Sequence, residues 1–320
     1  MKSISVVIVS WNAKDHLRRC LDSIREHASD CVLETIVIDN DSADGSAEMV
    51  AAEFPQAILI RAGSNLGFGR ANNLGFARAR GDFVAMINSD VTLHPDCLQR
   101  LEAYLRSDPG ACLAAPRIVG RTGTLQLTCK RLPGLWNTFC RFAALDRLMP
   151  KSDLFSGFEY TAARHESTAR VPAIGGCFWL LRKTAIEQVG PFDERFFFYA
   201  EDIDWCKRFG ESGWSVVYYP QASATHYGGG SSEKAPVRYS VEIIRSTLQY
   251  WQKHHGALGH MLCFLMFVAH HAVKLVTRLF VWLLSAGRSH ATSSKMAQDY
   301  SCLRWLLTRD EASLGRSRTH

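Results

Sequence analysis

The chain has 320 residues, of which 47% are hydrophobic and 21% are charged, with 23 glycines and 10 prolines. This composition is typical of a globular protein with a sizeable core, and it excludes a disordered, collagen-like or porin-like chain. The ten cysteines form no CxxC pair and no metal-finger spacing, and most lie in apolar runs. They are predicted to be reduced, buried thiols of a cytosolic protein. The first apolar run is too short for a signal peptide.

The net charge of +6 is unevenly distributed along the chain. Residues 234–320 carry 12 Lys and Arg against 4 Asp and Glu, whereas the first 233 residues carry 25 against 27. A basic segment on a nearly neutral body predicts a partner for that segment. Its basic residues are interleaved with Leu, Phe, Val and Trp, and no nucleic-acid-binding module is recognisable. An anionic membrane surface is therefore favoured over nucleic acid.

The first half of the chain alternates between predicted strands and helices. Strands are predicted at residues 3–9, 33–38, 57–60 and 83–87, and helices at 15–24, 46–54, 70–80 and from Pro95 onward. This alternation predicts an α/β fold with a mostly parallel sheet covered by helices. Polar clusters follow three of the strands, at residues 10–12, 39–42 and 88–90. Ligands of such sheets bind beyond the carboxyl ends of the strands, so these clusters are candidate binding residues.

The second half is less regular. Residues 120–170 are rich in Gly, Arg and aromatic residues without periodicity, which predicts long loops or a mobile lid. A regular pattern resumes at residues 171–181. It is followed by a predicted helix at 183–189, a strand at 214–220 and a helix at 236–254.

Two acids and one glycine-rich turn in the first half are candidate binding or catalytic features. Asp90 ends a strong apolar strand, where a carboxylate either caps the following turn or holds a divalent cation against a diphosphate. Asp39 is the acid of its turn best placed to accept a hydrogen bond from a nucleobase. The sequence GFGRAN at residues 67–72 is only a near miss of the dinucleotide fingerprint. As a glycine-rich turn before a helix, it can instead place backbone N–H groups and Arg70 near a phosphate.

Two further groups lie in the second half. Glu201, Asp202 and Asp204 fall in the first turn of a predicted helix, where acids suit the helix dipole. They follow three Phe and a Tyr, so a general base in a partly closed cleft is the functional alternative. His226 lies between a strand and three glycines, in a predicted turn where a ligand role competes with an ordinary surface position.

Seven segments, in this order, resemble the bacterial family-2 glycosyltransferases of the GT-A fold, especially their rhamnosyltransferase-like branch. They are VVIVSWN, VIDNDSADGS, NLGFGRANN, NSD, IGGCFWLLRK, GPFDERFFFYAEDIDWCKR and THYGGGS, and the resemblance covers about residues 3–255. It implies a nucleotide-diphospho-sugar transferase fold, Rossmann-like, with a mixed, mostly parallel sheet and flanking helices. The predicted division is a catalytic domain at 1–255 and a basic, apolar helical tail at 256–320.

The resemblance implies inverting transfer of a sugar from a nucleoside diphosphate donor to a cell-surface polysaccharide or lipid-linked glycan. The first expectation for the donor is dTDP-rhamnose, followed by UDP-hexoses. Asp202 matches the catalytic base, with Glu201 as its competitor, and Gly175 and Gly176 match the acceptor side. Asp90 and His226 match ligands of a divalent cation, Mg²⁺ or Mn²⁺, although Asn88 stands where the family has the first acid of its metal motif. The implied donor-binding residues are Ser10, Asn12, Asp39, Asn65, Arg70, Asn88, Ser89 and Asp90.

Alternatives from other classes are an inactive membrane scaffold that binds a nucleotide sugar or glycan, a nucleotidyltransferase, and a nicotinamide-dependent dehydrogenase. Retention of Asp90, Asp202 and His226 together argues against the scaffold. The sequence after the first strand, SWNAKDH, lacks the glycine-rich loop that is usual in nucleotidyltransferases. The incomplete fingerprint argues against the dehydrogenase.

The tail contains an apolar stretch at residues 257–287 that is long enough to span a bilayer. His270, Lys274 and Arg278 interrupt it at spacings of four and form one polar stripe. Each cation at mid-span costs about 2.5–3.5 kcal/mol on the insertion scale. A helix or hairpin lying on the cytoplasmic face of the cell membrane, with the stripe toward anionic headgroups, is therefore predicted. The alternative is an amphipathic helix docked on the catalytic domain.

Overall fold

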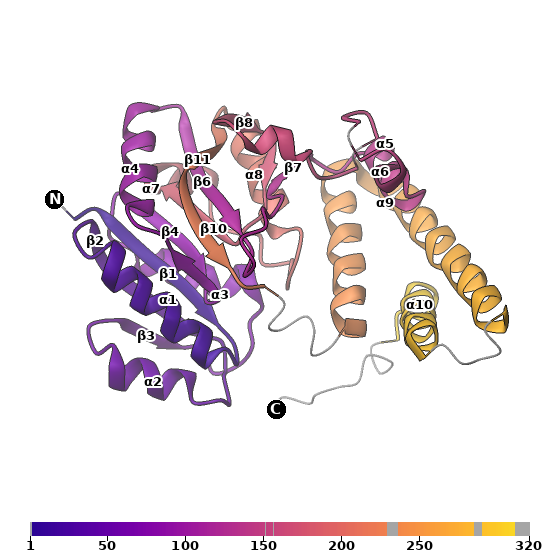
Figure 1. The fold of residues 1–320 in the computed structure, drawn as a ribbon, viewed down its shortest axis with the longest axis horizontal. Coiled ribbons are helices and arrows are strands. Elements are labelled where there is room, and N and C mark those ends of the chain that lie inside the picture. Colours follow the sequence, from indigo (N-terminus) through magenta and orange to yellow (C-terminus); the bar gives the residue numbers. More distant parts are fainter. Residues whose placement is uncertain (1, 151, 156, 229–235, 285–289, 311–320) are drawn as a thin grey trace.

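The computed structural model describes residues 2–150, 152–155, 157–228, 236–284 and 290–310. Its main sheet has the order β3-β2-β1-β4-β10-β6-β11-β5, with β8 paired to β11 (Figure 1). The strands of this sheet are β1 (Ile4–Ser10), β2 (Val32–Asp39), β3 (Ile58–Arg61), β4 (Phe83–Asn88), β5 (Val91–Leu93), β6 (Ala111–Val119), β8 (Ala169–Val171), β10 (Phe178–Arg182) and β11 (Ser215–His226). A smaller sheet pairs β7 (Cys129–Lys130) with β9 (Ala173–Ile174).

The main sheet is mixed but mostly parallel, as predicted. Strands β3, β2, β1 and β4 are mutually parallel, and β6 is parallel to β11. Strand β10 runs antiparallel to both β4 and β6, and β5 and β8 run antiparallel to β11. The parallel strands therefore end at one shared edge, where the polar clusters of the sequence follow β1, β2 and β4.

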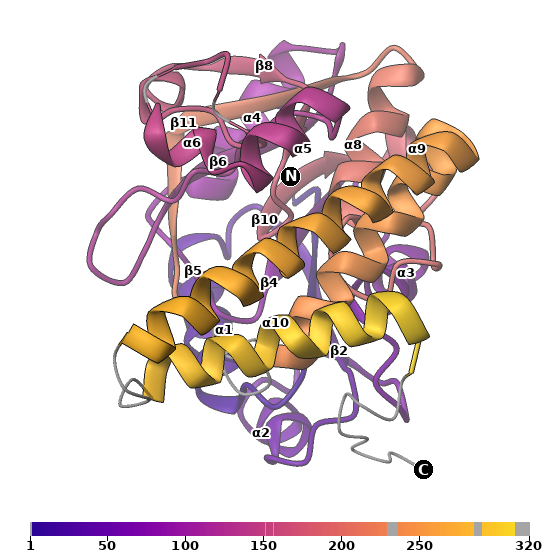
Figure 2. The same cartoon turned by 90° about the vertical axis from the view of Figure 1, so that its right-hand side faces the viewer.

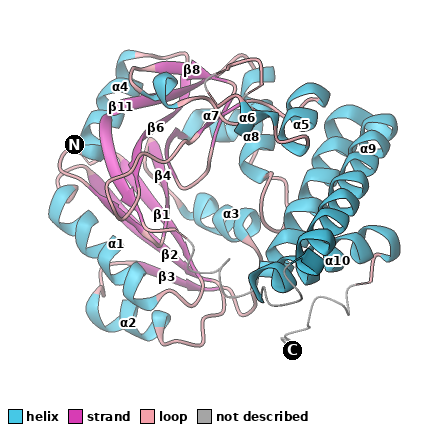
Figure 3. Cartoon of the chain, turned by 45° about the vertical axis from the view of Figure 1, so that its right-hand side comes forward, coloured by secondary structure: helices cyan, strands magenta, loops and turns pink. Residues whose placement is uncertain are grey.

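Helices cover both faces of the sheet (Figure 3). They are α1 (Lys14–His27), α2 (Ser46–Glu53), α3 (Phe68–Arg78), α4 (Cys97–Ser107), α5 (Leu135–Phe142), α6 (Leu145–Leu148), α7 (Lys183–Val189), α8 (Glu201–Glu211), α9 (Pro236–Leu284) and α10 (His290–Thr308), with a 3₁₀ turn at Ala162–His165. On one face α1, α2 and α4 pack on Ile4, Val6 and Ile8 of β1; on the other, α3, α7, α8 and α9 form the core that includes Val7. Burial on both faces explains why β1 is a continuous apolar run.

Helix α9 consists of two segments. Gly256 interrupts it with φ 67° and ψ −168°, a conformation available mainly to glycine. The first segment packs on the catalytic core, and the second runs along the outside of the molecule with α10 and α5 beside it (Figures 1 and 2). The interruption lies at the predicted boundary between residues 1–255 and 256–320, although the division into two domains stays a prediction. Residues 285–287 of the predicted tail helix lie outside the described residues.

The structure differs from the sequence-based expectation in three places. Residues 120–170 contain β7, α5, α6 and β8 rather than only loops, and α5 is docked on α9 because Phe142 packs against Phe267 with ring centroids 4.8 Å apart. Strands β5 and β6 were not predicted, since β5 has three residues and β6 contains Pro116. His226 is the last residue of β11 and not part of a turn. All ten cysteines are free, as predicted.

Candidate active site

A cleft of about 880 Å³ opens at the carboxyl ends of β1 and β4. It forms there because the two strands are parallel neighbours, with Val9 opposite Asn88. The sequence-predicted site residues that line it are Asn12, Asn65, Asn88, Ser89, Asp90, Gly175, Gly176, Glu201, Asp202 and His226.

Three predicted donor-binding residues do not line the cleft. Ser10 and Asp39 lie opposite each other at the ends of β1 and β2 and are buried. The Ser10 Oγ and Asp39 Oδ1 atoms have no hydrogen-bond partner, while Asp39 Oδ2 accepts from the Ser42 N–H at 3.2 Å. Arg70 points into solvent and pairs with Glu194 at 3.5 Å. A role for these three residues in donor binding stays a prediction.

The glycine-rich turn before α3 contacts the loop that precedes α8. Gly67 has φ 82°, and a Cβ there would lie 2.2 Å from the Phe197 carbonyl oxygen. The Phe68 N–H donates to that same carbonyl at 2.8 Å. The Asn40 side-chain amide donates to Asn65 at 3.0 Å and to the Gly67 carbonyl at 3.2 Å. The turn therefore fixes the position of the aromatic loop at the mouth of the cleft.

Asp90 and His226 are brought together by the pairing of β5 with β11. Val91 lies opposite His226, and the Asp90 carbonyl accepts from the Tyr227 N–H at 3.0 Å. Nε2 of His226 is 3.3 Å from Oδ1 of Asp90. Burial raises the pKa of Asp90, but the hydrogen bond and charge of His226 outweigh it and hold the pKa below its usual value. Asp90 is therefore ionised at neutral pH.

The Asp90 and His226 pair fits a cation that takes its remaining ligands from a substrate. Within the described ranges, no group of three or more His, Cys, Asp or Glu side chains converges on one point. Mg²⁺ and Mn²⁺ commonly bind through one or two protein groups together with phosphate oxygens and water. Next to this pair, Asn88 Oδ1 is buried without a hydrogen-bond partner. A carboxylate, an imidazole and a free amide oxygen are suitable donors for such an ion.

Glu201 and Asp202 begin α8 immediately after two residues in the left-handed region, Tyr199 at φ 69° and Ala200 at φ 65°. This strained turn aims the start of the helix at the cleft. Oδ2 of Asp202 accepts from the Gly176 N–H at 3.2 Å, and Oδ1 accepts from the Ile203 N–H at 2.8 Å. These two contacts fix the orientation of the Asp202 carboxylate at the wall of the cleft.

The two adjacent acids differ in their environment. Glu201 is buried, and its Oε2 has no hydrogen-bond partner. Burial, followed by the charge of Asp202, raises the pKa of Glu201 well above its usual value, which favours the neutral form of this acid. Asp202 is only partly buried. Of the two, Asp202 is the acid suited to accept a proton from a bound molecule.

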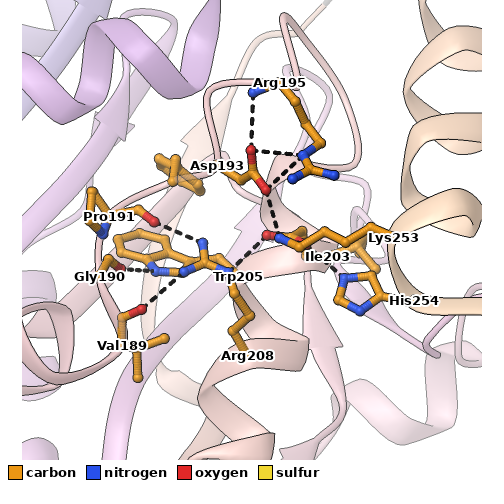
Figure 4. A network of polar contacts seen from close by, with 12 residues as sticks. Val189, Gly190, Pro191, Asp193, Arg195, Ile203, Trp205, Arg208, Lys253 and His254 are labelled. Carbon is orange, nitrogen blue, oxygen red and sulfur yellow. Dashed lines mark hydrogen bonds and ion pairs between the residues drawn. The ribbon is translucent and has the colours of Figure 1, made fainter.

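Asp204, the third acid of the motif, belongs to a structural network (Figure 4). Its fully buried carboxylate accepts from Lys253 at 2.6 Å, His254 at 2.7 Å and Arg208 at 2.9 Å. Lys253 also bridges to Asp193 at 2.8 Å. Burial raises the pKa of Asp204, but hydrogen bonds from His254 and Lys253 bring it below its usual value. The network ties α8 to the last turn of the first α9 segment.

Several residues of the cleft were not found from the sequence. Gln126, Thr128, Lys130 and Glu159 come from the region without periodicity, and Arg238, Tyr239 and Glu242 come from α9. No local pattern marks the α9 residues, because they reach the cleft only through tertiary packing. His16, in the first turn of α1, also lines the cleft. It closely follows the SWN sequence at residues 10–12, so that motif could have indicated it.

The sequence was compared with models of known families. The model of glycosyl transferase family 2 matches residues 5–190, which include Asp90 and the acceptor-side glycines. The chain belongs to glycosyl transferase family 2. The nucleotidyltransferase and dehydrogenase alternatives are thereby replaced by a family-2 glycosyltransferase.

The curated relatives include rhamnosyltransferases. An N-acetylglucosaminyl-diphospho-decaprenol L-rhamnosyltransferase of Mycobacterium tuberculosis is 29% identical over 265 residues, covering 79% of this chain and 85% of its own. The rhamnosyltransferase WbbL of Escherichia coli is 24% identical over 257 residues, covering 77% and 92%. The glycosyltransferase is therefore similar to the rhamnosyltransferase-like members of the family, as predicted.

Solved structures confirm the GT-A fold. A mannosyltransferase from Pyrobaculum calidifontis, in complex with GDP-Man and Mn²⁺, superposes with a TM-score of 0.56 at 16% identity, covering 97% of this chain and 89% of that one. GalNAc-T7 with UDP, GalNAc and Mn²⁺ gives a TM-score of 0.54 at 16% identity, covering 72% and 44%.

The distinct roles of Asp202 and Asp204 predict different effects on stability. Asp204→Asn leaves Lys253 and Arg208 without their buried counter-charge and should lower the free energy of unfolding by about 3 kcal/mol. Asp202→Asn, the same change two residues away, should alter it by less than about 0.5 kcal/mol. Urea denaturation of both variants measures the difference. Equal losses would contradict the division of roles.

Proposed function

We propose that this glycosyltransferase moves a sugar, with rhamnose as the first expectation, from a nucleoside diphosphate donor to a lipid-linked glycan or polysaccharide, with inversion at the anomeric carbon. The observation that carries the proposal is that Asp202 and the Asp90–His226 pair line the same cleft. The donor class is supported by the nucleotide sugars in the titles of the structural neighbours, and the acceptor by the decaprenyl diphosphate in the name of the mycobacterial relative.

The reaction is a single displacement. The acceptor hydroxyl attacks the anomeric carbon of the donor on the face opposite the diphosphate, the bond to the diphosphate oxygen breaks, and Asp202 accepts the hydroxyl proton. The Gly176 N–H holds the Asp202 carboxylate in place for this step. The raised pKa of Glu201 favours its neutral form, which keeps a second negative charge away from the acceptor side.

Asp90 and His226 would hold a divalent cation at the diphosphate end of the cleft. Such a cation, when bound, neutralises negative charge that develops on the departing diphosphate. Asn88 and Ser89, which precede Asp90 at the end of β4, line the same part of the cleft and are placed to contact the donor. Gly175 and Gly176 leave room for the acceptor on the side of Asp202, and a Cβ on Gly176 would lie 3.1 Å from the Asp202 Cβ.

We further propose that the outer face of the second α9 segment binds the cytoplasmic face of a membrane. Among the described residues of this segment, every exposed side chain except Thr277 is apolar, and seven of these apolar side chains recur at helical spacing. They are Leu258, Met261, Leu265, Val273, Val276, Phe280 and Leu283, each between 49% and 66% exposed. We call this set the outer stripe. Among described helices, α9 is long and apolar enough to cross a bilayer, a criterion that core helices also meet. Neighbouring α5 exposes Leu135, Trp136 and Phe139, residue types typical of membrane interfaces.

The polar stripe of this helix faces the protein, so the expectation that it meets lipid headgroups is wrong for His270 and Arg278. His270 stacks on Phe142 with ring centroids 4.6 Å apart, and burial lowers its pKa to about 4. Arg278 pairs with Asp299 of α10 and donates to the Lys295 carbonyl at 2.7 Å. These partners hold the polar side chains on the inner side of the helix. The outer stripe contains no charged residue. Attraction to anionic lipid then rests on the basic excess of the tail as a whole.

Asp202→Asn keeps the shape of the side chain but removes its ability to take a proton. We expect kcat to fall by about 10²–10⁴-fold with donor binding retained. Glu201→Gln resembles the neutral acid that the raised pKa of Glu201 favours, and it should retain most activity. Steady-state transfer assays measure kcat, and donor titrations measure donor affinity, for both variants. An inactive Glu201→Gln beside a nearly wild-type Asp202→Asn would reverse the two assignments.

Asp90→Ala should nearly abolish turnover while the fold remains intact. Thermal shifts against a panel of nucleoside diphosphate sugars, with and without Mn²⁺, give the readout. The wild-type protein should be stabilised by its donor far more when Mn²⁺ is present, and Asp90→Ala should lose that difference. Full transfer activity of Asp90→Ala in the presence of EDTA would contradict the assignment of a metal ion to Asp90.

Binding to vesicles tests the outer stripe. The full-length protein should sediment with phosphatidylglycerol-containing vesicles, and high salt should release only part of it, since insertion of apolar side chains is not screened. Val276→Glu should weaken partitioning by about tenfold, the loss of one buried valine contact. Thr277→Glu, its exposed neighbour off the stripe, is the matched control and should have little effect. Recovery of the wild-type protein in the supernatant at low salt would refute the membrane assignment.

A further inference from the structure

The imidazole of His226 has a hydrogen-bonding partner on the side away from Asp90. Oε1 of Gln126 lies 2.9 Å from Nδ1 of His226. Nε2 of the same amide donates to the backbone carbonyl of His226 at 2.9 Å. Gln126 is itself held, because its backbone N–H donates to the Ile118 carbonyl of β6 at 2.9 Å. The glutamine thus contacts both the ring and the main chain of one residue.

These two contacts determine which ring nitrogen carries the hydrogen. A carbonyl oxygen only accepts, so the Gln126 atom facing the His226 carbonyl is the NH₂ group. The other amide atom is then the oxygen, which also only accepts, and it faces Nδ1. Nδ1 must therefore be the protonated nitrogen. When the ring is charged, Nε2–H also faces Asp90 Oδ1, 3.3 Å away. When the ring is neutral and Nδ1 keeps its hydrogen, Nε2 carries the lone pair and directs it to the place that a cation at Asp90 would occupy.

We propose that Gln126 is a positioning residue that holds His226 in its Nδ1–H tautomer and directs the Nε2 lone pair to the cation site at Asp90. The inference rests on the proposed function, since it takes Asp90 and His226 as cation ligands. Histidines that bind metals usually donate their other N–H to an oxygen, which fixes both tautomer and ring orientation. Gln126 supplies that oxygen from the irregular region between β6 and β7.

The side-chain chemistry of Gln126 distinguishes this role from simple packing. Gln126→Leu has nearly the same size but removes both the acceptor for Nδ1–H and the donor to the His226 carbonyl. Gln126→Glu keeps an acceptor for Nδ1–H and loses only the donor. A packing role predicts that the leucine variant behaves like wild type. A positioning role predicts that the glutamate variant retains the tautomer and the leucine variant does not.

The tautomer can be measured directly on the full-length protein labelled with ¹⁵N-histidine. Long-range ¹H–¹⁵N spectra, recorded where the histidines are neutral, distinguish protonated from unprotonated ring nitrogens, and His226→Gln identifies the His226 signals. We expect the Nδ1–H form in wild type and in Gln126→Glu, and a mixture with the Nε2–H form in Gln126→Leu. Gln221→Leu is the matched control, because Gln221 is an exposed glutamine on the same strand as His226 and does not line the cleft.

Binding of Mn²⁺ alone, followed by the EPR signal of the free ion, provides the second readout. Gln126→Leu should weaken Mn²⁺ binding by about 10–100-fold, the usual loss when an outer partner of a ligand is removed, and Gln221→Leu should not change it. If wild type binds Mn²⁺ and Gln126→Leu changes neither affinity nor tautomer, the role of Gln126 is refuted while the cation site stands. An Nε2–H tautomer in the neutral ring of wild type refutes the role of Gln126 directly. Failure of wild type to bind Mn²⁺ both alone and in the presence of dTDP overturns the cation site itself, and this inference with it.

Discussion

The three-residue pairing of β5 with the end of β11 is the contact on which the proposed cation site depends. Asp90 lies between β4 and β5, and His226 is the last residue of β11, 136 positions later in the chain. Because β5 folds back antiparallel and places Val91 opposite His226, the carboxylate and the imidazole meet. The remaining parallel strands bring their polar ends to the same edge, so Asn12, Asn88 and Ser89 line the cleft together with this pair.

At the start of α8, one helix turn gives three acids three different properties. Glu201 is buried without an ion pair and its pKa is raised, whereas the buried Asp204 has three basic partners and its pKa is lowered. Asp202 lies between them in sequence and reaches the cleft, where backbone N–H groups orient it. The local environment of each carboxylate, rather than its residue type, thus decides which can act as a base. The strained Tyr199–Ala200 turn directs the start of α8, with Glu201 and Asp202, to the cleft.

Much of this architecture could be predicted from the sequence, and the reasons for the failures are physical. Strands β1 and β4 are buried on both faces and are nearly continuous apolar runs, and β2 is apolar and buried at residues 36–38, so the ends of these strands and the polar clusters after them could be predicted. Strand β5 is too short to show a period, and its role appears only through pairing with β11. Gln126 and Lys130 lie where no periodicity exists. Arg238 and Tyr239 reach the cleft because of how α9 packs, which no local pattern encodes.

The same limit applies to the tail. The spacing of His270, Lys274 and Arg278 correctly predicted one polar face, but a sequence pattern does not state whether a face meets solvent, lipid or protein. Phe142 and Asp299, from α5 and α10, occupy that face and leave the apolar side exposed. The first α9 segment lines the cleft and the second carries the outer stripe. One helix therefore connects the cleft with the surface proposed to bind a membrane.

The central claim is a single displacement at the cleft with Asp202 as the base. The most direct test is the anomeric configuration of the transferred sugar, measured from the one-bond carbon–proton coupling in the NMR spectrum of the purified product. The reaction would use a nucleoside diphosphate sugar, Mn²⁺ and a lipid-linked N-acetylglucosaminyl diphosphate acceptor. Inversion relative to the donor is the predicted result. Retention of the donor configuration would contradict the account, because it requires two displacements or front-face attack.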